Sequence, residues 1–134
     1  MNQKLVYLDS SAILKIVVAE PESRALFELL NGWPLRISSE LARTEVVRAL
    51  RRAGATVQQF RRGQQALERI SLIPIDSRIL SDAALMKPAA LRTLDAVHLA
   101  TALSLRAELA AVVTYDTHLS TAALAAKLRV WSPH

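Results

Sequence analysis

Short runs of β-branched and other apolar residues alternate with longer stretches rich in Ala, Leu and Arg along this sequence. The alternation predicts strands separated by helices, which is the pattern of βαβ crossovers and therefore of a parallel sheet. The expected strands are at 4–8, 35–38, 72–75, 110–114 and 128–131. Because crossover helices cover both faces of such a sheet, the predicted fold is α/β, a short parallel β-sheet flanked by helices on both faces.

Capping residues, prolines and glycines place the helices between these strands. The expected helices are at about 12–18, 20–30, 39–52, 56–70, 76–86, 96–105 and 120–127. The sequence contains no internal repeat and no linker rich in Pro, Gly or Ser. A chain of 134 residues with 51% hydrophobic residues is then expected to form one domain, residues 1–134.

Several classes of protein are excluded by what the sequence lacks. It has no cysteine, which removes disulfides, thiolate zinc sites and cysteine nucleophiles. Its 3 glycines are too far apart for either common nucleotide-binding loop, G-x-G-x-x-G or Walker A. No stretch approaches the ~18 apolar residues of a membrane span, and Asp9 and Lys15 interrupt the apolar N-terminus. We therefore expect a cytoplasmic protein with no membrane contact.

The charge balance indicates a polyanionic partner. Lys and Arg number 17 against 12 Asp and Glu, which gives a formal net charge of +5 and a pI near 10.2. Most of the cations are arginines, whose forked donors suit phosphate groups. Arg43, Arg48 and Arg52 are candidates for binding such a partner. The alternative is that these arginines only form solvated helix faces with a few ion pairs.

Four acidic residues occupy positions that do not look like ordinary solvated surface. Asp9 directly follows the first expected strand, and Asp116 lies two residues beyond Thr114, where another strand ends. Asp95 opens a nearly apolar helical segment, and Glu45 precedes apolar neighbours on another helix. Since ligands of open parallel sheets lie beyond the carboxyl ends of the strands, we expect Asp9 and Asp116 to meet at one edge.

Carboxylates that cluster repel one another unless protons or a cation neutralise them, and Mg²⁺ or Mn²⁺ suits a site made only of carboxylates. Each acid also has a purely structural alternative. Asp9, Asp95 and Asp116 are each suited to cap a helix, and Glu45 has Arg48 at the i+3 spacing of a helix-surface ion pair. These alternatives stay open at the level of sequence.

Four segments of the sequence carry a family resemblance. They are Leu8–Ala12 (LDSSA), Thr44–Leu50 (TEVVRAL), Leu94–Ala102 (LDAVHLATA) and Val113–Leu119 (VTYDTHL). In this order and spacing they resemble the PIN-domain family and, within it, the VapC-type toxins of toxin–antitoxin pairs. The resemblance covers nearly the whole chain. One departure is at the end, where the family commonly has a glycine before the final strand and this chain has Lys127 and Leu128.

The resemblance implies a PIN fold and an Mg²⁺-dependent endoribonuclease, the toxin of a VapBC-type pair, which cleaves RNA with a metal-activated water. The family's acidic quartet corresponds to Asp9, Glu45, Asp95 and Asp116. Of these, Asp9, Asp95 and Asp116 are expected to hold the metal, and Glu45 to orient or deprotonate the attacking water or to ligate a second ion. Ser10 and Thr114 match small hydroxyl positions that support the quartet.

The resemblance also implies a VapB-like antitoxin and a homodimer. A mean hydropathy of +0.21 and the Ala- and Leu-rich segment 122–128 favour an interface, although packing inside the monomer is the competing interpretation. The alternative function is a PIN-domain ribonuclease in housekeeping RNA processing rather than a toxin. A ribonuclease built on His98 and His118 would not need the four acids, and these two histidines are expected instead to pack or to form hydrogen bonds.

Overall fold

The computed structural model describes residues 3–134 and contains a five-stranded parallel sheet in the order β3-β2-β1-β4-β5. The strands are β1 (Leu5–Leu8), β2 (Leu35–Ser39), β3 (Ser71–Ile73), β4 (Leu109–Val113) and β5 (Val130–Trp131). The helices of the described residues are α1 (Ser10–Val17), α2 (Ser23–Asn31), α3 (Leu41–Arg52), α4 (Val57–Glu68), α5 (Ser77–Ala84), α6 (Thr93–Leu103) and α7 (Thr117–Ala125). The predicted α/β fold with a parallel sheet is confirmed.

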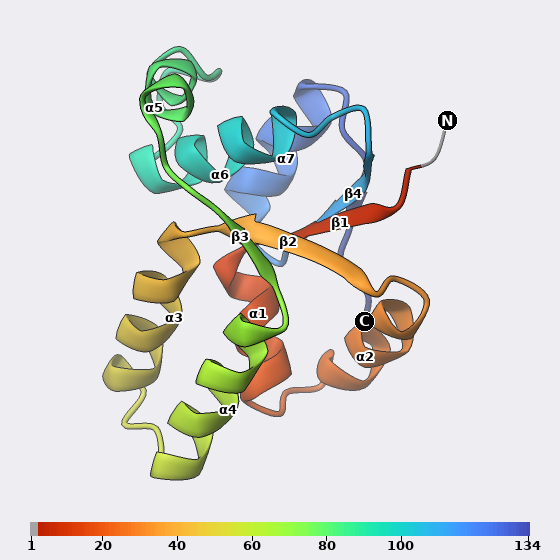
Figure 1. Cartoon of the computed structure of the whole chain (residues 1–134), viewed down its shortest axis with the longest axis vertical. Coiled ribbons are helices and arrows are strands. Elements are labelled where there is room, and N and C mark those ends of the chain that lie inside the picture. Colours follow the sequence, from red (N-terminus) through yellow and green to blue (C-terminus); the bar gives the residue numbers. More distant parts are fainter. Residues whose placement is uncertain (1–2) are drawn as a thin grey trace.

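Helices cover both faces of the sheet, with α1–α4 on one side and α5–α7 on the other (Figure 1). The central strand β1 is buried between them and alternates its side chains between two hydrophobic cores. Val6 and Leu8 pack on the α1–α4 side, and Tyr7 packs with Leu99 and Leu119 on the α6–α7 side. The chain leaves β1 in one direction through β2 and β3 and in the other through β4 and β5, so the strand order reverses between β1 and β4. Such a switch point is where open parallel sheets bind ligands.

Several helix starts differ by two or three residues from the sequence prediction, including α2, which begins at Ser23 rather than at 20. The differences at α7 and α6 involve the candidate acids. Helix α7 begins at Thr117 rather than Ser120, because the Asp116 side chain accepts hydrogen bonds from the first free backbone N–H groups of the helix. Helix α6 begins at Thr93, and Arg92 rather than Asp95 occupies its N-cap position. The capping alternative for Asp95 is therefore wrong.

The Ala- and Leu-rich segment near the C-terminus is used mostly inside the monomer. Ala122, Ala123 and Leu128 are buried in the core formed with α6 and β4. Leu124 is the large exposed hydrophobic residue of this segment, with 55% of its surface accessible. The packing interpretation of this segment is thus the one that the structure favours. None of the helices in residues 3–134 is long and apolar enough to cross a membrane.

The missing glycine before β5 leaves Lys127 in a left-handed backbone conformation. Lys127 has φ = 69° and follows the C-cap of α7, which is the position where helices commonly place glycine. A residue with a Cβ pays a steric penalty there that glycine avoids. Lys127→Gly is therefore expected to raise the free energy of unfolding by about 1 kcal/mol, measured by urea denaturation.

The matched control for this substitution is Gly54→Ala. Gly54 has φ = 64° after the C-cap of α3, and a Cβ there would meet no neighbouring atom, so backbone strain is the main penalty. This control should lower the free energy of unfolding by a similar amount. A Lys127→Gly protein that is less stable than wild type would show that the side chain of Lys127 contributes more than its backbone strain costs.

Candidate functional site

Asp9 lies at the carboxyl end of β1 and is held by hydrogen bonds on both carboxylate oxygens. It is 4% exposed and caps α1. Its Oδ1 accepts from the backbone N–H of Ala12 at 3.0 Å and from Ser11 Oγ at 2.7 Å, and its Oδ2 accepts from Thr114 Oγ1 at 2.6 Å. Asp9 therefore caps a helix, as the structural alternative expects, and does so from a buried position at the sheet edge.

Thr114 connects Asp9 to Asp116 across the switch point. Its Oγ1 donates to Asp9 and accepts from the backbone N–H of Asp116 at 3.0 Å. Asp116 is half-buried, and its Oδ1 accepts from the backbone N–H groups of His118 at 2.8 Å and Leu119 at 3.0 Å. The expected meeting of Asp9 and Asp116 at one edge thus has a direct physical link through the Thr114 hydroxyl.

Glu45 reaches the same edge from α3 and forms no ion pair with Arg48. Its Oε1 accepts from Ser10 Oγ at 2.5 Å and lies 2.6 Å from His98 Nε2. Arg48 is exposed, whereas Glu45 is turned toward the start of α1 and toward α6. The i+3 ion pair that the helix spacing suggested is therefore wrong, because Glu45 faces inward and its partners come from distant parts of the chain.

Asp95 is the third residue of α6 and is half-buried. His98 follows it by three residues, so the two side chains lie on the same side of the helix. The imidazole of His98 is 3% exposed and lies between Tyr7 and Glu45. Helix α6 thus brings one acid and one buried histidine to the edge where Asp9 and Asp116 lie.

The pKa directions show that the charges of Asp9 and Asp116 act on neighbouring acids. Burial raises the pKa of Asp9, although the hydrogen bonds from Thr114 and Ser11 oppose it. Burial also raises the pKa of Asp95, and the negative charges of Asp116 and Asp9 add to this effect. These carboxylates are therefore close enough to make each other's ionisation less favourable.

Glu45 behaves in the opposite way. Burial alone would raise its pKa, but the hydrogen bond and charge of His98, together with the Ser10 hydroxyl, outweigh burial and lower the pKa. The charge of Asp116 acts against this lowering. The fold consequently favours the ionised form of Glu45.

The donor set fits a hard divalent cation. It consists of carboxylate oxygens, which Mg²⁺ and Mn²⁺ prefer, and the negative charges of Asp116 and Asp9 contribute to the raised pKa of Asp95. In residues 3–134, no arginine or lysine forms an ion pair with Asp9, Glu45, Asp95 or Asp116. Within the same residues, no group of three His, Asp or Glu side chains is arranged so that it could hold a metal ion by itself. Mg²⁺ commonly binds through only one or two carboxylates and keeps several waters.

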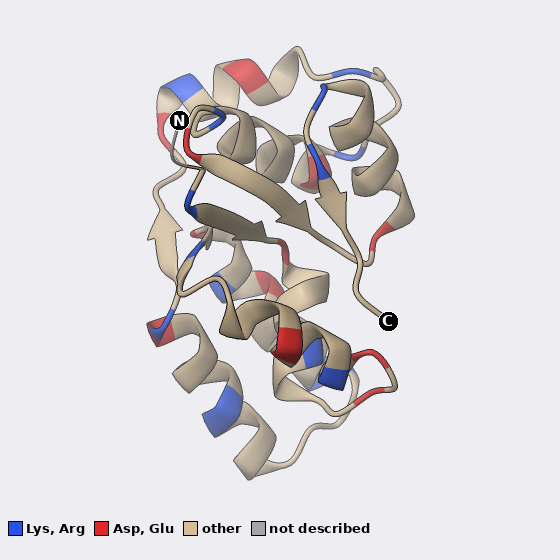
Figure 2. Cartoon of the chain, turned by 90° about the vertical axis from the view of Figure 1, so that its right-hand side faces the viewer, with Lys and Arg blue, Asp and Glu red and all other residues tan. Residues whose placement is uncertain are grey.

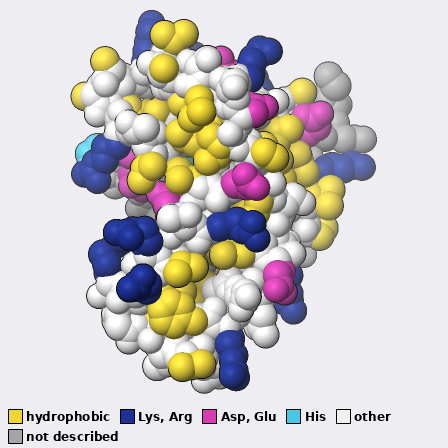
Figure 3. Space-filling model, turned by 60° about the vertical axis from the view of Figure 1, so that its left-hand side comes forward, with side chains coloured by type: hydrophobic (Ala, Val, Ile, Leu, Met, Phe, Trp, Pro, Cys, Tyr) yellow, Lys and Arg dark blue, Asp and Glu magenta, His cyan; other side chains and the backbone are white. Residues whose placement is uncertain are grey.

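Basic side chains lie near this edge but are not confined to it. Figure 3 shows acidic side chains at mid-height on one face, with lysine and arginine side chains beside and below them. Figure 2 shows lysines and arginines on helices on both sides of the sheet. The three arginines singled out from the sequence, Arg43, Arg48 and Arg52, are exposed on α3, the helix that also carries Glu45.

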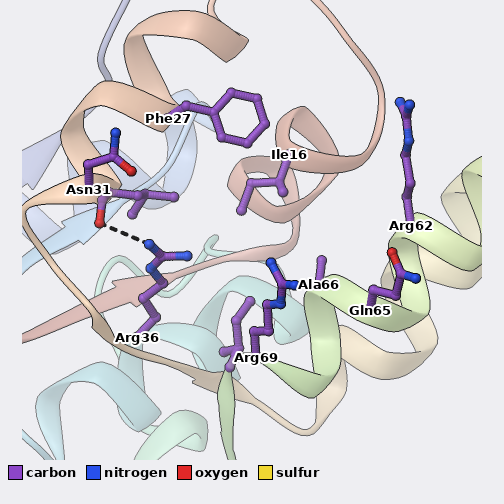
Figure 4. A pocket seen from close by; sticks show the side chains of 10 residues that line it. Ile16, Phe27, Asn31, Arg36, Arg62, Gln65, Ala66 and Arg69 are labelled. Carbon is purple, nitrogen blue, oxygen red and sulfur yellow. Dashed lines mark hydrogen bonds between the residues drawn. The ribbon is translucent and has the colours of Figure 1, made fainter.

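A separate cavity of about 310 Å³ lies between α1, α2 and α4 (Figure 4). Arg36 and Arg69 line it together with the half-exposed ring of Phe27. Arg36 donates to the backbone oxygens of Leu30 at 2.9 Å and Trp33 at 3.0 Å, and both burial and the charge of Arg69 lower its pKa. This cavity is cationic and apolar, so its chemistry differs from that of the acidic edge.

Three polar residues of the acidic edge were not identified from the sequence as part of the site. Ser11 donates to Asp9 and accepts from the backbone N–H of Tyr115 at 2.9 Å. His98 and Tyr7 form a buried pair behind Glu45. Two sequence signals point to His98 and Tyr7: His98 is about one turn after Asp95, and Tyr7 is two residues before Asp9, the spacing at which extended residues share a face.

Comparisons with known proteins agree with this geometry. The chain matches the PIN domain family over residues 6–124. It is 44% identical over 128 residues to ribonuclease VapC46 of Mycobacterium tuberculosis (strain ATCC 25618 / H37Rv), covering 96% of this chain and 97% of that protein. It is 34% identical over 119 residues to ribonuclease VapC47 of Mycobacterium tuberculosis (strain CDC 1551 / Oshkosh), covering 86% of this chain and 87% of that one.

Solved structures share the fold at lower sequence identity. A chain of a toxin–antitoxin complex from Klebsiella pneumoniae superposes with a TM-score of 0.71 at 23% identity, covering 96% of this chain and 98% of that one. VapC20 of Mycobacterium tuberculosis, a Sarcin-Ricin loop cleaving toxin, superposes with a TM-score of 0.69 at 14% identity, covering 87% and 94%. With the family matched across most of its length and curated relatives well above 30% identity, the chain belongs to the PIN-domain family and, within it, groups with the VapC ribonucleases.

Proposed function

We propose that this protein is an Mg²⁺-dependent endoribonuclease, the toxin of a VapBC-type toxin–antitoxin pair. The observation that carries the proposal is the group of acids at the switch point of the sheet, where Thr114 links Asp9 to Asp116 and where burial, together with the charges of these two acids, raises the pKa of Asp95. The relatives named VapC ribonucleases support RNA as the substrate. The neighbour from a toxin–antitoxin complex supports an antitoxin as the partner.

Asp9, Asp95 and Asp116 are the residues that we propose to hold Mg²⁺, with Mn²⁺ as a substitute. The chemistry that a bound Mg²⁺ supplies is charge relief at the phosphate and a more acidic water molecule. Thr114 keeps the Asp9 carboxylate in place and fixes the backbone of Asp116. Ser10 does the same for Glu45 through its hydroxyl.

Glu45 is the residue that we propose to orient and deprotonate the attacking water. Its lowered pKa keeps it ionised, and an ionised carboxylate accepts a proton. Both hydrogen bonds that it makes within residues 3–134 fall on Oε1, so Oε2 is available for a water. Glu45 takes a proton from the water as its oxygen forms a bond to phosphorus, and the bond to the 3′-oxygen breaks. The leaving 3′-oxygen takes a proton from solvent water, so the products carry a 5′-phosphate and a 3′-hydroxyl.

The remaining parts of the proposal concern the partners. Arg43, Arg48 and Arg52 on the exposed side of α3 would bind the RNA backbone next to the acidic edge, since phosphate contacts provide most of the sequence-independent affinity. A VapB-like antitoxin would silence the enzyme, and the active toxin would be a cytoplasmic homodimer. Light scattering of the purified protein tests the dimer, because the monomer has a mass of 14.7 kDa.

Cleavage of RNA in vitro with mapping of both product ends tests the reaction. We expect cleavage with Mg²⁺, loss of cleavage with EDTA and recovery when Mg²⁺ is restored in excess. Products are expected to carry 5′-phosphate and 3′-hydroxyl ends, because water is the nucleophile. Fragments that end in 2′,3′-cyclic phosphate, or cleavage that persists in EDTA, would contradict this mechanism and favour acid–base catalysis by histidines.

A further inference from the structure

We propose that Tyr7 and His98 are positioning residues that hold the Glu45 carboxylate in its working orientation. The three side chains form a linear chain of hydrogen bonds from the middle of the sheet to the acidic edge. This inference rests on the proposed function, in which Glu45 handles the attacking water. It adds two residues that never touch the substrate but set the geometry of one that does.

The chain of contacts is short and well packed. Tyr7 Oη lies 2.6 Å from His98 Nδ1, and His98 Nε2 lies 2.6 Å from Glu45 Oε1. Tyr7 is 0% exposed and His98 3% exposed, and the two rings meet edge to face with centroids 5.8 Å apart. Tyr7 belongs to the central strand β1, so the phenol that anchors this chain is fixed in the middle of the sheet.

Donor and acceptor chemistry fixes the direction of the bond to Glu45. An ionised Glu45 only accepts, so His98 Nε2 must carry a hydrogen and donate it. In a neutral imidazole Nδ1 is then the acceptor and the hydroxyl of Tyr7 donates to it, whereas in an imidazolium Nδ1 donates and the oxygen of Tyr7 accepts. In both forms the bond to Tyr7 holds the ring so that Nε2–H points at Glu45.

The surroundings argue against His98 as an ordinary core residue. The helical segment 96–102 is entirely buried, and most of its residues are apolar. An unpaired polar group there is destabilising, whereas a leucine would pack without needing partners. His98 is instead paired at both nitrogens, and its outer bond ends on an acid of the candidate site. Mutation of a residue that orients a catalytic carboxylate or a metal ligand through a hydrogen bond commonly lowers activity by about 10–100-fold.

Two substitutions at His98 separate positioning from simple packing. His98→Leu fills the space but removes the donor to Glu45, and we expect kcat to fall by roughly 10–100-fold with KM for RNA nearly unchanged. His98→Gln retains an N–H that reaches Glu45, and it should recover most of the lost kcat. Tyr7→Phe removes the hydrogen bond that holds the His98 ring, and it should lower kcat in the same direction by a smaller factor.

A double-mutant cycle tests whether His98 acts through Glu45. In single-turnover assays with excess enzyme, His98→Leu should have little further effect once Glu45→Gln is present, because the group that His98 positions has lost its function. A full, independent loss in that background would overturn the proposal and assign His98 a purely structural effect. Melting temperatures of all variants show which of them retain the fold.

A measurement without metal or RNA provides an independent readout. In ¹⁵N NMR of the metal-free protein, we expect Nε2 of His98 to carry a hydrogen, and we expect the Nδ1 resonance to shift in Tyr7→Phe. A His98 whose Nε2 carries no hydrogen would overturn the proposal even if every variant were well folded.

Failure of this inference is distinguishable from failure of the proposed function. If Asp9→Asn abolishes cleavage while His98→Leu and Tyr7→Phe cleave like wild type, the positioning role is wrong and the nuclease stands. If Asp9→Asn itself cleaves like wild type, the acid site is wrong, and a positioning role for its Glu45 is overturned with it.

Discussion

Asp9→Asn is expected to reduce Mg²⁺-dependent RNA cleavage by at least about 100-fold without unfolding the protein. Asparagine has the same shape as aspartate and is an equally good N-cap, so its side-chain oxygen still accepts from the N–H of Ala12. The negative charge at the switch point is lost, and with it the ability to hold a cation beside the scissile phosphate. Initial rates on a labelled RNA, together with far-UV circular dichroism, measure both parts of this expectation.

The chain offers a closely matched control in Asp76. Asp76 caps α5 with nearly the same backbone angles as Asp9 has at α1, and its Oδ1 accepts from the N–H of Ile79 at 2.9 Å. It is exposed, and it makes no contact with the four acids in the described residues. Asp76→Asn should therefore cleave RNA within about twofold of wild type. Equal activity of the Asp9 and Asp76 variants would show that Asp9 is only a helix cap.

The fold and the position of the acids follow largely from local sequence rules. Short apolar runs separated by helical stretches were sufficient to predict a parallel sheet, because βαβ crossovers have few alternatives. Proline has no N–H to donate to a neighbouring strand, so Pro74 favours an edge or an end of a strand, and β3 is the edge strand and stops just before it. The helix caps at Asp9 and Asp116 could also be predicted from local sequence, because capping involves only the next three residues.

Such local rules do not predict contacts between residues that are far apart in the sequence. Local spacing suggested Arg48 as the partner of Glu45, but the partners are Ser10 and His98, which are 35 and 53 residues away. Tyr7 and His98 are 91 residues apart. These pairs exist only because the parallel sheet brings the start of α1, the middle of α3 and the first turns of α6 to one edge. A helix-period pattern contains no information about that convergence.

Asp9 and Asp95, which serve the proposed reaction, should also make the metal-free protein less stable. The directions of their pKa shifts give the sign of this effect on stability as the pH changes. The pKa of Asp9 and of Asp95 is raised in the folded state, so the fold favours their protonated forms, and their ionisation lowers stability as the pH rises from 3.8 through the folded pKa values. Glu45 has the opposite sign: its lowered pKa contributes stability above about 4.5 that is lost as the pH falls through the folded pKa. Metal-free Asp9→Asn should therefore melt above wild type near neutral pH, and the difference should vanish below pH 3.8.

Mg²⁺ is expected to reverse this order by stabilising the wild-type protein. A ligand that binds only the folded state at 100 times its Kd adds about 2.7 kcal/mol, which is roughly 10 °C in melting temperature for a domain of this size. Asp9→Asn should gain much less from Mg²⁺, and NaCl at matched ionic strength should not reproduce the gain, because screening alone does not place a cation between buried carboxylates. Thermal melts of both proteins, with and without Mg²⁺, measure the two effects together. If Mg²⁺ stabilises both proteins equally, the ion binds elsewhere; if Asp9→Asn melts well below wild type without metal, the capping role of the Asp9 carboxylate outweighs the repulsion that its charge creates.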